Sequence, residues 1–363
     1  RTFCGAGVAK TARGVHLDTA RLYQIDAGDG DTESVLGACI EPFPSMQKQI
    51  YMATKASPMA TPHRSLSRQS VIEQCETSLS KLCLDCVDLF YLHSPDIKTD
   101  IDETLDAVAE LHSQGKIKEL GLSNYPAWMV ADIWHRCKAK GMIVPTVYQA
   151  MYNVITRDIE KELIPVVRQF GLRLYVYNPL AGGVLSGRYA SLKDVGDSRS
   201  GRFSSECSSA KLYRTRYSKE AILEGVDVIR HACQPPDDDP EGAAPSTTTL
   251  QESVVDGVKV QLEVTETVVK QPRQPPLDMA GVALRWLIHH SGLRSDDAII
   301  LGVSKVEHLA ANLAAWHLGP LPEHIVKACD AAWEVSQPAC EAYFRGLGAK
   351  AGGSEFFLRG LER

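Results

Sequence analysis

Seven short apolar runs recur along the chain, and their hydrophobic residues are continuous rather than alternating with polar ones. Runs of this kind are typical of parallel β-strands that are covered on both faces. The pattern therefore predicts seven parallel strands. They lie in the stretches VHLD (15–18), IYMATKA (50–56), VDLFYLH (87–93), KELGLSN (118–124), TVYQAMYN (146–153), LRLYVYNPL (172–180) and AIILGVS (298–304).

Helical periodicity occupies the segments between these runs. In IDETLDAVAEL, for example, the residues Ile101, Leu105, Val108 and Leu111 fall on one face of a helix. Several predicted helices end at a glycine that passes directly into the next strand, because glycine readily adopts the left-handed conformation that caps a helix. These glycines are Gly14, Gly115, Gly141 and Gly171, and the first of them predicts a helix over residues 1–13.

The alternation of strands and helices predicts an α/β fold, a (β/α)8 TIM barrel, in preference to an open doubly wound sheet. A dinucleotide-binding fold of the doubly wound kind would need G-x-G-x-x-G after its first strand, and the sequence has no such motif there. Because a helix over residues 1–13 would come directly before the strand at 15–18, the first strand of such a barrel has no counterpart. We therefore expect a barrel that lacks its first strand and is truncated at its N-terminus.

A Pro-, Asp- and Thr-rich insertion separates the seventh and eighth strands of this barrel. We expect residues 234–276 to form a loop or to be disordered, and the Asp-Gly pair in SVVDGVKVQLEV is compatible with a surface hairpin. The expected organisation is one barrel domain over residues 1–345, followed by a flexible, Gly-rich tail over residues 346–363.

The composition excludes several classes of protein. With 44% hydrophobic residues, 23% charged residues and a net charge of -6, the chain has no basic cluster for nucleic acid or an anionic membrane surface. It also has no apolar stretch near the ~20 residues of a membrane helix. Its 10 cysteines are scattered, which indicates reduced thiols in the cytoplasm. Cys83 and Cys86 have the spacing of a zinc or redox pair, but no second pair completes a site, so we interpret them as structural.

Polar side chains stand at the carboxyl ends of successive predicted strands. In a barrel these ends share one rim, where catalytic groups gather. Core packing does not explain a polar residue at so many strand ends in succession. The residues at these ends are Asp18, Lys55, His93, Ser123, Asn124, Gln149, Tyr177 and Asn178.

Tyr23 follows Asp18 on the loop that leaves the first predicted strand, so it can lean over this rim. A phenol has a pKa of ~10 and is a poor acid, but a nearby ammonium lowers that pKa, and a carboxylate can hold the ammonium in place. Asp18, Lys55 and Tyr23 are therefore predicted to form a proton-donating relay. His93, if neutral, would hydrogen-bond and orient a carbonyl oxygen, a role that we prefer to that of a satisfied core histidine.

These residues carry a family resemblance. The motifs LDTARLY, ATKA, LFYLH, SNY and NPLAGG resemble those of the aldo-keto reductases. Longer stretches, such as ELGLSNYPAW, YNPLAGGVLSGRY and AIILGVSKVEHLAANLAA, are similar to the aflatoxin-aldehyde reductase subgroup, which includes succinic semialdehyde reductases. The resemblance implies a (β/α)8 barrel, an NADPH cofactor and the reduction of small carboxylated aldehydes, dialdehydes or dicarbonyls to alcohols.

The resemblance also implies a role for each matching residue. Tyr23 would be the general acid, tuned by Lys55 and Asp18, and His93 would orient the carbonyl. Ser123, Asn124 and Gln149 would hold the nicotinamide carboxamide, with Tyr177 stacked on its ring. The pyrophosphate would be wrapped by Asn178, Pro179, Leu180, Ala181, Gly182, Gly183, Leu185, Gly187 and Arg188. Arg202, Ser304, His308 and Asn312 would lie at the adenosine end, and Tyr213, Arg216 and Arg345 would join His93 in binding the polar end of the substrate.

Two other functions compete with this interpretation. An NADPH-binding, redox-sensing subunit with little turnover, like the potassium-channel β subunits, would share the same barrel. A barrel metallohydrolase is disfavoured, because His93 is the only imidazole at the strand ends and no metal is expected. The expected partner is a small-molecule aldehyde, with no nucleic acid and no membrane. A monomer and a homodimer are both compatible with the sequence.

Overall fold

The computed structural model describes residues 7–11, 14–23, 31–59, 65–199, 201–234, 248–255, 258–265 and 277–345. The predicted tail over residues 346–363 lies outside these residues, as does most of the predicted insertion. No helix in the described ranges has both the length and the apolar character that crossing a membrane requires.

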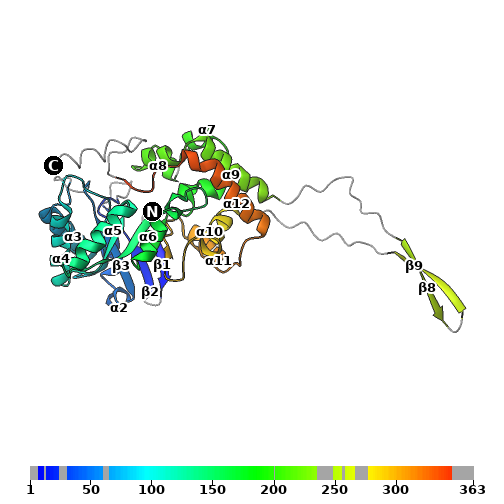
Figure 1. Cartoon of the computed structure of the whole chain (residues 1–363), viewed down its shortest axis with the longest axis horizontal. Helices are drawn as coiled ribbons and strands as arrows, with labels where there is room; N and C mark the ends of the chain where they lie inside the picture. The colour runs from blue at the N-terminus through cyan, green and yellow to red at the C-terminus, as the bar shows by residue number, and fades with distance from the viewer. Residues whose placement is uncertain are drawn as a thin grey trace.

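Seven parallel strands form one curled sheet with helices packed around it, which confirms the predicted barrel class (Figure 1). Neighbouring strands follow the order of the sequence from β2 to β7, and β10 pairs with β7 at the far edge. The parallel strands are β2 (Gly14–Asp18), β3 (Ile50–Ala56), β4 (Val87–Leu92), β5 (Ile117–Ser123), β6 (Pro145–Met151), β7 (Arg173–Tyr177) and β10 (Ala298–Ile299).

Helices connect the strands and cover the outer face of the sheet, where most of the hydrophobic core lies (Figure 1). The α-helices are α1 (Thr32–Ile40), α2 (Pro44–Gln47), α3 (Arg68–Leu82), α4 (Ile101–Ser113), α5 (Ala127–Ala139), α6 (Leu163–Gln169), α7 (Leu192–Gly196), α8 (Ala210–Tyr217), α9 (Glu220–Ala232), α10 (Met279–His289), α11 (Val306–Trp316) and α12 (Glu323–Ser336). Short 3-10 turns are η1 (Asp158–Glu160), η2 (Ala181–Ser186), η3 (Gly201–Phe203) and η4 (Gln337–Ala339).

The predicted helix over residues 1–13 is wrong where the structure describes it. Residues Gly7–Thr11 form a strand, β1, which pairs antiparallel with β2, and Gly14 begins β2 instead of capping a helix. The segment GVAKT combines a glycine with a β-branched valine and threonine, which disfavours a helix, and the ladder to β2 satisfies its backbone groups. The other predicted helix-capping glycines are confirmed, because Gly115, Gly141 and Gly171 have φ values of 71°, 66° and 70°.

The insertion between β7 and β10 contains a hairpin at the place where the sequence allowed one within the predicted loop. Strands β8 (Thr248–Val255) and β9 (Val258–Thr265) pair antiparallel in a two-stranded sheet of their own. The register joins Val255 to Val258, and the Asp-Gly pair between them lies outside the described residues. The hairpin that the sequence allowed is therefore confirmed.

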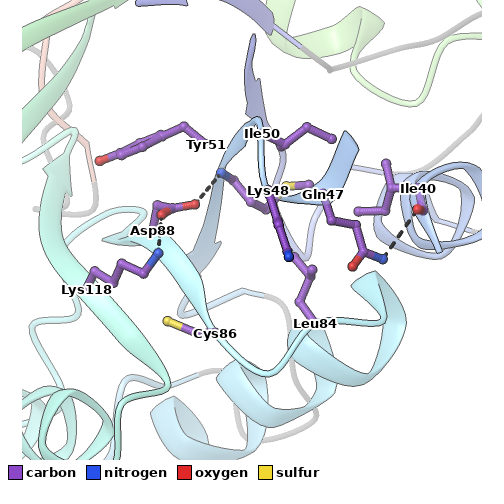
Figure 2. Close-up of a pocket in the computed structure, with 10 residues that line it drawn as sticks. Ile40, Gln47, Lys48, Ile50, Tyr51, Leu84, Cys86, Asp88 and Lys118 are labelled. Carbon is purple, nitrogen blue, oxygen red and sulfur yellow. Dashed lines mark hydrogen bonds and ion pairs between the residues drawn. The ribbon is translucent and has the colours of Figure 1, made fainter. Parts of the chain in front are cut away.

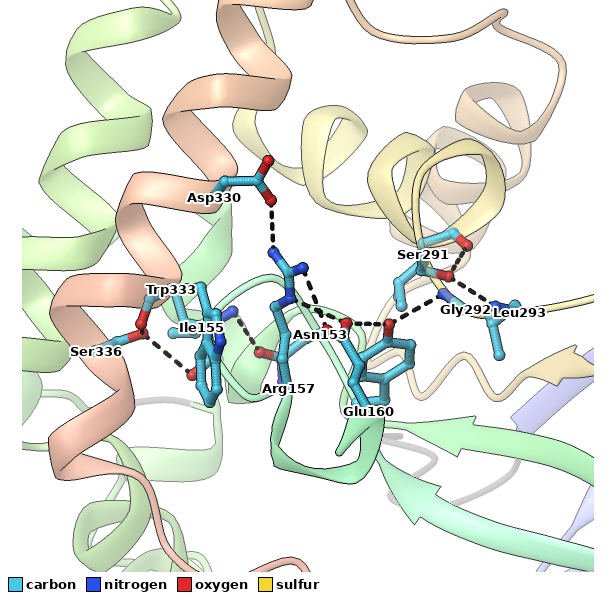
Figure 3. A network of polar contacts seen from close by, with 12 residues as sticks. Asn153, Ile155, Arg157, Glu160, Ser291, Gly292, Leu293, Asp330, Trp333 and Ser336 are labelled. Carbon is cyan, nitrogen blue, oxygen red and sulfur yellow. Dashed lines mark hydrogen bonds and ion pairs between the residues drawn. The ribbon is translucent and has the colours of Figure 1, made fainter. Parts of the chain in front are cut away.

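A polar network anchors the segment after β6 to the helices near the C-terminus (Figure 3). Arg157 donates from Nη1 to Asp330 of α12 at 2.8 Å and from Nε to Glu160 of η1 at 3.0 Å. The Tyr152 hydroxyl donates to Glu160 and accepts from the Gly292 N–H at 3.1 Å. These bonds tie η1 to α12 and to the segment that follows α10.

Candidate active site

The strand register brings the predicted strand-end residues to one rim. Across β2 and β3, Asp18 is level with Ala53, and across β5 and β6, Ser123 is level with Gln149. Tyr177 ends β7, level with Met151. Because parallel strands present their carboxyl ends on the same side, side chains that are distant in sequence become neighbours there.

Lys55 and Asp18 form a buried ion pair at this rim. The Lys55 ammonium donates to Asp18 Oδ1 at 2.5 Å and to the Thr19 carbonyl at 2.8 Å, and no part of the lysine side chain is exposed. Burial lowers the pKa of Lys55, but the Asp18 carboxylate and the Tyr23 phenol raise it more, so that its pKa is above the ordinary value. Lys55 is therefore a fixed positive charge at neutral pH.

Tyr23 lies beside this ammonium on the loop between β2 and α1. Its N–H donates to the Ala20 carbonyl, and its own carbonyl accepts bonds from both the N–H and the hydroxyl of Thr32, all three at 3.0 Å. These bonds hold the backbone so that the centroid of the phenol ring lies 4.8 Å from Lys55 Nζ.

The acidity of Tyr23 differs from the sequence expectation. Burial raises the pKa of the phenol, and the lowering effect of Lys55 does not overcome it, so the net change is upward. The predicted net lowering is therefore wrong in sign, because the sequence shows the charged neighbour but not the loss of solvent. The consequence is a phenol that stays protonated at neutral pH, which is the form that a proton donor needs.

His93 follows β4 and faces Tyr23. Its backbone N–H donates to the Ala56 carbonyl at 2.8 Å. Its ring meets the Tyr23 ring edge-on, with centroids 5.9 Å apart and an interplanar angle of 87°. Burial and then the charges of Lys55 and Arg345 lower the pKa of His93 well below its usual value, so the imidazole is neutral at pH 7. Its Nδ1 is buried and has no hydrogen-bond partner among the described residues.

The amide side chains at the rim are held by their neighbours. Gln149 Nε2 donates to Asp18 Oδ2 at 2.8 Å, and Asn124 Nδ2 donates to the His93 carbonyl at 2.8 Å and to Ser123 Oγ at 2.9 Å. The Tyr177 hydroxyl donates to Asn124 Oδ1 at 3.1 Å. Ser123, Asn124 and Tyr177 therefore form one hydrogen-bonded group, and Gln149 is bonded to the ion pair itself.

The loop after β7 has the backbone conformation of an anion site. Positive φ values occur at Asn178 (58°), Ala181 (50°), Gly182 (70°), Gly183 (104°) and Gly187 (75°). Successive residues of this kind turn backbone N–H groups toward one side, and such nests bind phosphates. The predicted role of this segment, which also holds Pro179, Leu180, Leu185 and Arg188, at the pyrophosphate of a dinucleotide stays a prediction.

Three arginines approach the same loop from different elements. The centres of the Arg202 and Arg216 guanidinium groups lie 5.3 and 5.8 Å from the Tyr213 ring centroid, and the Tyr213 hydroxyl donates to Asn178 Oδ1 at 2.8 Å. Arg345 donates from Nη2 to the Tyr177 hydroxyl at 3.3 Å. Arg216 is only 6% exposed, and its Nη2 has no partner in the described part of the chain. A buried guanidinium nitrogen without a hydrogen-bond partner is costly, so this position fits an anionic group of a ligand.

The predicted residues on and before α11 are less closely tied to the site. Ser304 and His308 are exposed, and Asn312 is buried. Across the described ranges, no side-chain hydrogen bond joins these three residues to the cluster around Lys55. Their predicted role at the adenosine end of a cofactor stays a prediction.

Sequence reasoning missed the residues that support the rim from behind. Glu33 of α1 is fully buried and accepts from the Thr54 hydroxyl at 2.6 Å and from Arg21 at 2.9 Å. Through Arg21, it fixes the loop that carries Tyr23. The sequence signal is weak, because one glutamate in a short helix is ordinarily a solvated residue.

The opposite rim has a pocket of about 410 Å³ that contains none of the predicted site residues (Figure 2). There Asp88 accepts from Lys118 at 2.7 Å and from the Met52 N–H at 2.9 Å. Cys86 lines this pocket, and Cys83 is the exposed cap of α3; both are free thiols. No group of three or more His, Cys, Asp or Glu residues within the described ranges could hold a metal ion.

Comparisons with known proteins agree with this arrangement. A model of the Aldo/keto reductase family matches residues 1–334. Aflatoxin B1 aldehyde reductase member 2 of Mus musculus is 41% identical over 91% of this chain and 79% of its own length. Aflatoxin B1 aldehyde reductase member 4 of Homo sapiens is 41% identical over 90% of this chain and 87% of its own length. An aldo-keto reductase of Pseudocercospora fijiensis is 33% identical over 90% of this chain and 96% of its own length. The chain therefore belongs to the aldo/keto reductase family.

Proposed function

We propose that this enzyme reduces aldehydes to alcohols, with NADPH as the reductant and Tyr23 as the proton donor. The observation that carries the proposal is the meeting of a protonated phenol, a buried ammonium and a neutral imidazole at one rim. The relatives named as aflatoxin B1 aldehyde reductases support an aldehyde substrate. Bound at this rim, NADPH would supply a hydride to the carbonyl carbon.

The residues of the chain fit such a cofactor. The loop over residues 178–188 offers a nest for the pyrophosphate, and Ser123, Asn124 and Gln149 offer amide and hydroxyl groups for a carboxamide. In the structure Gln149 and Asn124 bind Asp18 and His93, so they would exchange these bonds for bonds to the cofactor. Tyr177, which is only partly buried, would lie against the nicotinamide ring.

The rim would then move one proton per turnover. His93 is neutral, so it can hydrogen-bond the carbonyl oxygen without competing to protonate it. As negative charge develops on that oxygen, the phenol of Tyr23 transfers its proton to it, and solvent later restores the proton. Lys55 stabilises the phenolate that remains, and Asp18 keeps Lys55 in place.

We propose that the preferred aldehydes carry a carboxylate. The unpartnered Nη2 of Arg216 and the nearby Arg345 and Tyr213 support this class, because a carboxylate would pair with a buried guanidinium. The check is a comparison of 2-carboxybenzaldehyde and succinic semialdehyde with benzaldehyde. We expect a KM at least about tenfold lower for the two acids, because charge-assisted bonds are strong. Equal KM values would contradict this substrate class.

The proton donor is tested by Tyr23→Phe, which removes the hydroxyl and keeps the ring. We expect kcat to fall by ~10²- to 10⁴-fold, the usual contribution of general acid catalysis, while NADPH binding, measured by fluorescence, stays within about twofold. The matched control is Tyr51→Phe, which removes a phenol at the opposite rim and should leave kcat unchanged. Full activity in Tyr23→Phe would refute the role of Tyr23. A parent protein that binds NADPH but does not consume it over many turnovers would instead favour a redox-sensing subunit.

A further inference from the structure

Tyr91 is a buried residue next to Lys55 to which the proposed reaction assigns no role. It is fully buried inside the barrel, and its hydroxyl has no hydrogen-bond partner among the described residues. Branched aliphatic residues usually fill such interior positions, and an unpartnered buried hydroxyl is costly. The reason for a tyrosine at this position therefore lies in its aromatic ring.

The ring of Tyr91 lies next to the ammonium of Lys55. In the register of β3 and β4, Lys55 is the direct neighbour of Tyr91. Lys55 Nζ lies 5.4 Å from the Tyr91 ring centroid and 4.8 Å from the Tyr23 ring centroid. The ammonium is thus within cation–π distance of two aromatic rings, and this attraction is strongest where water is excluded.

Gly121 provides the space that this ring position needs. It is the direct neighbour of Tyr91 on the other side, in β5. A Cβ atom on Gly121 would lie 2.3 and 2.5 Å from Cδ1 and Cε1 of the Tyr91 ring, which is far inside van der Waals contact. Glycine weakens a strand interior, so its presence there is explained by the close approach of the ring.

We propose that Tyr91 is a positioning residue whose ring holds the ammonium of Lys55 next to Tyr23, and that Gly121 provides the space for that ring. The inference rests on the proposed function, in which Lys55 stabilises the Tyr23 phenolate. It adds a support to the ion pair with Asp18: the carboxylate attracts the ammonium from one side, and the two rings restrict its position.

The first test compares two substitutions of Tyr91. Tyr91→Leu removes the ring, so we expect kcat to fall by roughly 3- to 30-fold with little change in KM, a range set by the strength of a desolvated cation–π contact. The alkaline limb of the kcat profile should move to lower pH, because Lys55 loses its proton more easily without the ring. Tyr91→Phe keeps the ring and should recover most of the turnover.

The second test separates positioning from packing. Phe90 directly precedes Tyr91 in β4 and is equally buried, but it belongs to the core on the outer face of the sheet. Phe90→Leu should lower stability about as much as Tyr91→Leu, with the pH profile unchanged. Gly121→Ala should resemble Tyr91→Leu in kcat, and the double variant should lose little more than either single variant, because both changes remove the same contact.

Two results would overturn the inference. One is a kcat profile of Tyr91→Leu that matches the profile of Phe90→Leu. The other is a loss in Tyr91→Phe as large as the loss in Tyr91→Leu, which would assign the role to the hydroxyl. A titration of the Lys55 Nζ resonance by ¹⁵N NMR needs no turnover, so it decides the inference even if the proposed reductase activity is absent: an unchanged titration midpoint in Tyr91→Leu would contradict it.

Discussion

Each rim of the barrel contains a carboxylate, a phenol, an imidazole and a cation. The two rims differ in how these groups are paired. At the amino-end rim, the carboxylate of Glu119 accepts from the Tyr51 hydroxyl at 2.7 Å and from the Thr146 hydroxyl at 2.6 Å, and it forms an ion pair with Arg173. His16 stacks on the Tyr51 ring with centroids 4.1 Å apart. Burial and the bond to Glu119 raise the pKa of Tyr51, so the phenol is held as a donor to that carboxylate.

At the carboxyl-end rim, the phenol and the imidazole are not bound to the carboxylate. Asp18 accepts from Lys55 and Gln149, which leaves the Tyr23 phenol beside the ammonium and the His93 imidazole with an unpartnered Nδ1. A group whose bonds are all satisfied stabilises the fold, whereas a group left without a partner is available to a ligand. The comparison shows that pairing, rather than the presence of these residue types, distinguishes a candidate catalytic rim from a structural one.

The largest expected difference between the rims comes from replacing their cations, Lys55 at the carboxyl-end rim and Arg173 at the amino-end rim. Lys55→Met leaves the buried Asp18 carboxylate unpaired and removes the charge beside Tyr23. We expect kcat/KM to fall by ~10²- to 10⁴-fold and the free energy of unfolding to fall by about 3 to 5 kcal/mol. NADPH oxidation and urea unfolding measure the two effects.

The matched change at the other rim is Arg173→Met. Arg173 and Glu119 are both partly exposed, with side-chain exposures of 28% and 24%, so water screens the loss. We expect a decrease of about 1 kcal/mol in stability and an unchanged kcat. The distinction between the rims would be wrong if Arg173→Met lost as much turnover as Lys55→Met.

An intermediate effect is expected from the two histidines, because burial lowers the pKa of both His93 and His16. The folded protein keeps each imidazole neutral at pH values where the unfolded chain binds a proton. The contribution of each buried imidazole to the free energy of unfolding is therefore complete above about pH 6.5. It is lost as the pH falls below that value. His93→Gln and His16→Gln should each reduce the dependence of the free energy of unfolding on pH between about pH 8 and about pH 5.

Turnover should separate the same two variants. His93→Gln should lower kcat by about 10²-fold, the usual effect of losing a bond to a developing oxyanion, whereas His16→Gln should leave kcat unchanged. The parent should show no acidic limb in kcat near pH 6.5, because His93 is already neutral there. An acidic limb that disappears in His93→Gln would show that His93 titrates in the working range, contrary to this prediction.

The smallest expected effect concerns the two phenols and the stability of the fold. Tyr51→Phe removes a bond to Glu119 and should lower the free energy of unfolding by about 1 kcal/mol. Tyr23→Phe should change stability by less than about 0.5 kcal/mol, because Lys55, which hydrogen-bonds the Tyr23 hydroxyl, keeps its bonds to Asp18 and to the Thr19 carbonyl. Urea titration of the two variants compares them directly, and the reverse order would contradict the assignment of structural and catalytic rims.

Much of the candidate site could be predicted from the sequence, because its residues stand at strand ends. The runs that end in Asp18, Lys55 and His93 are read from local patterns, and parallel strands must present these ends together. Strand β1 could not be predicted in this way. Its state depends on the ladder to β2, which is a pairing between segments rather than a property of either segment.

The sequence by itself determined the succession of strands and helices, the glycines that end helices at 115, 141 and 171, and the identity of the groups at one rim. These follow from local periodicity and from the alternation of side chains along a strand. Only the tertiary structure decided the sign of the pKa change at Tyr23 and the neighbours of Lys55 in the barrel interior. Both depend on burial and on register between strands, which are set when the sheet curls and excludes water.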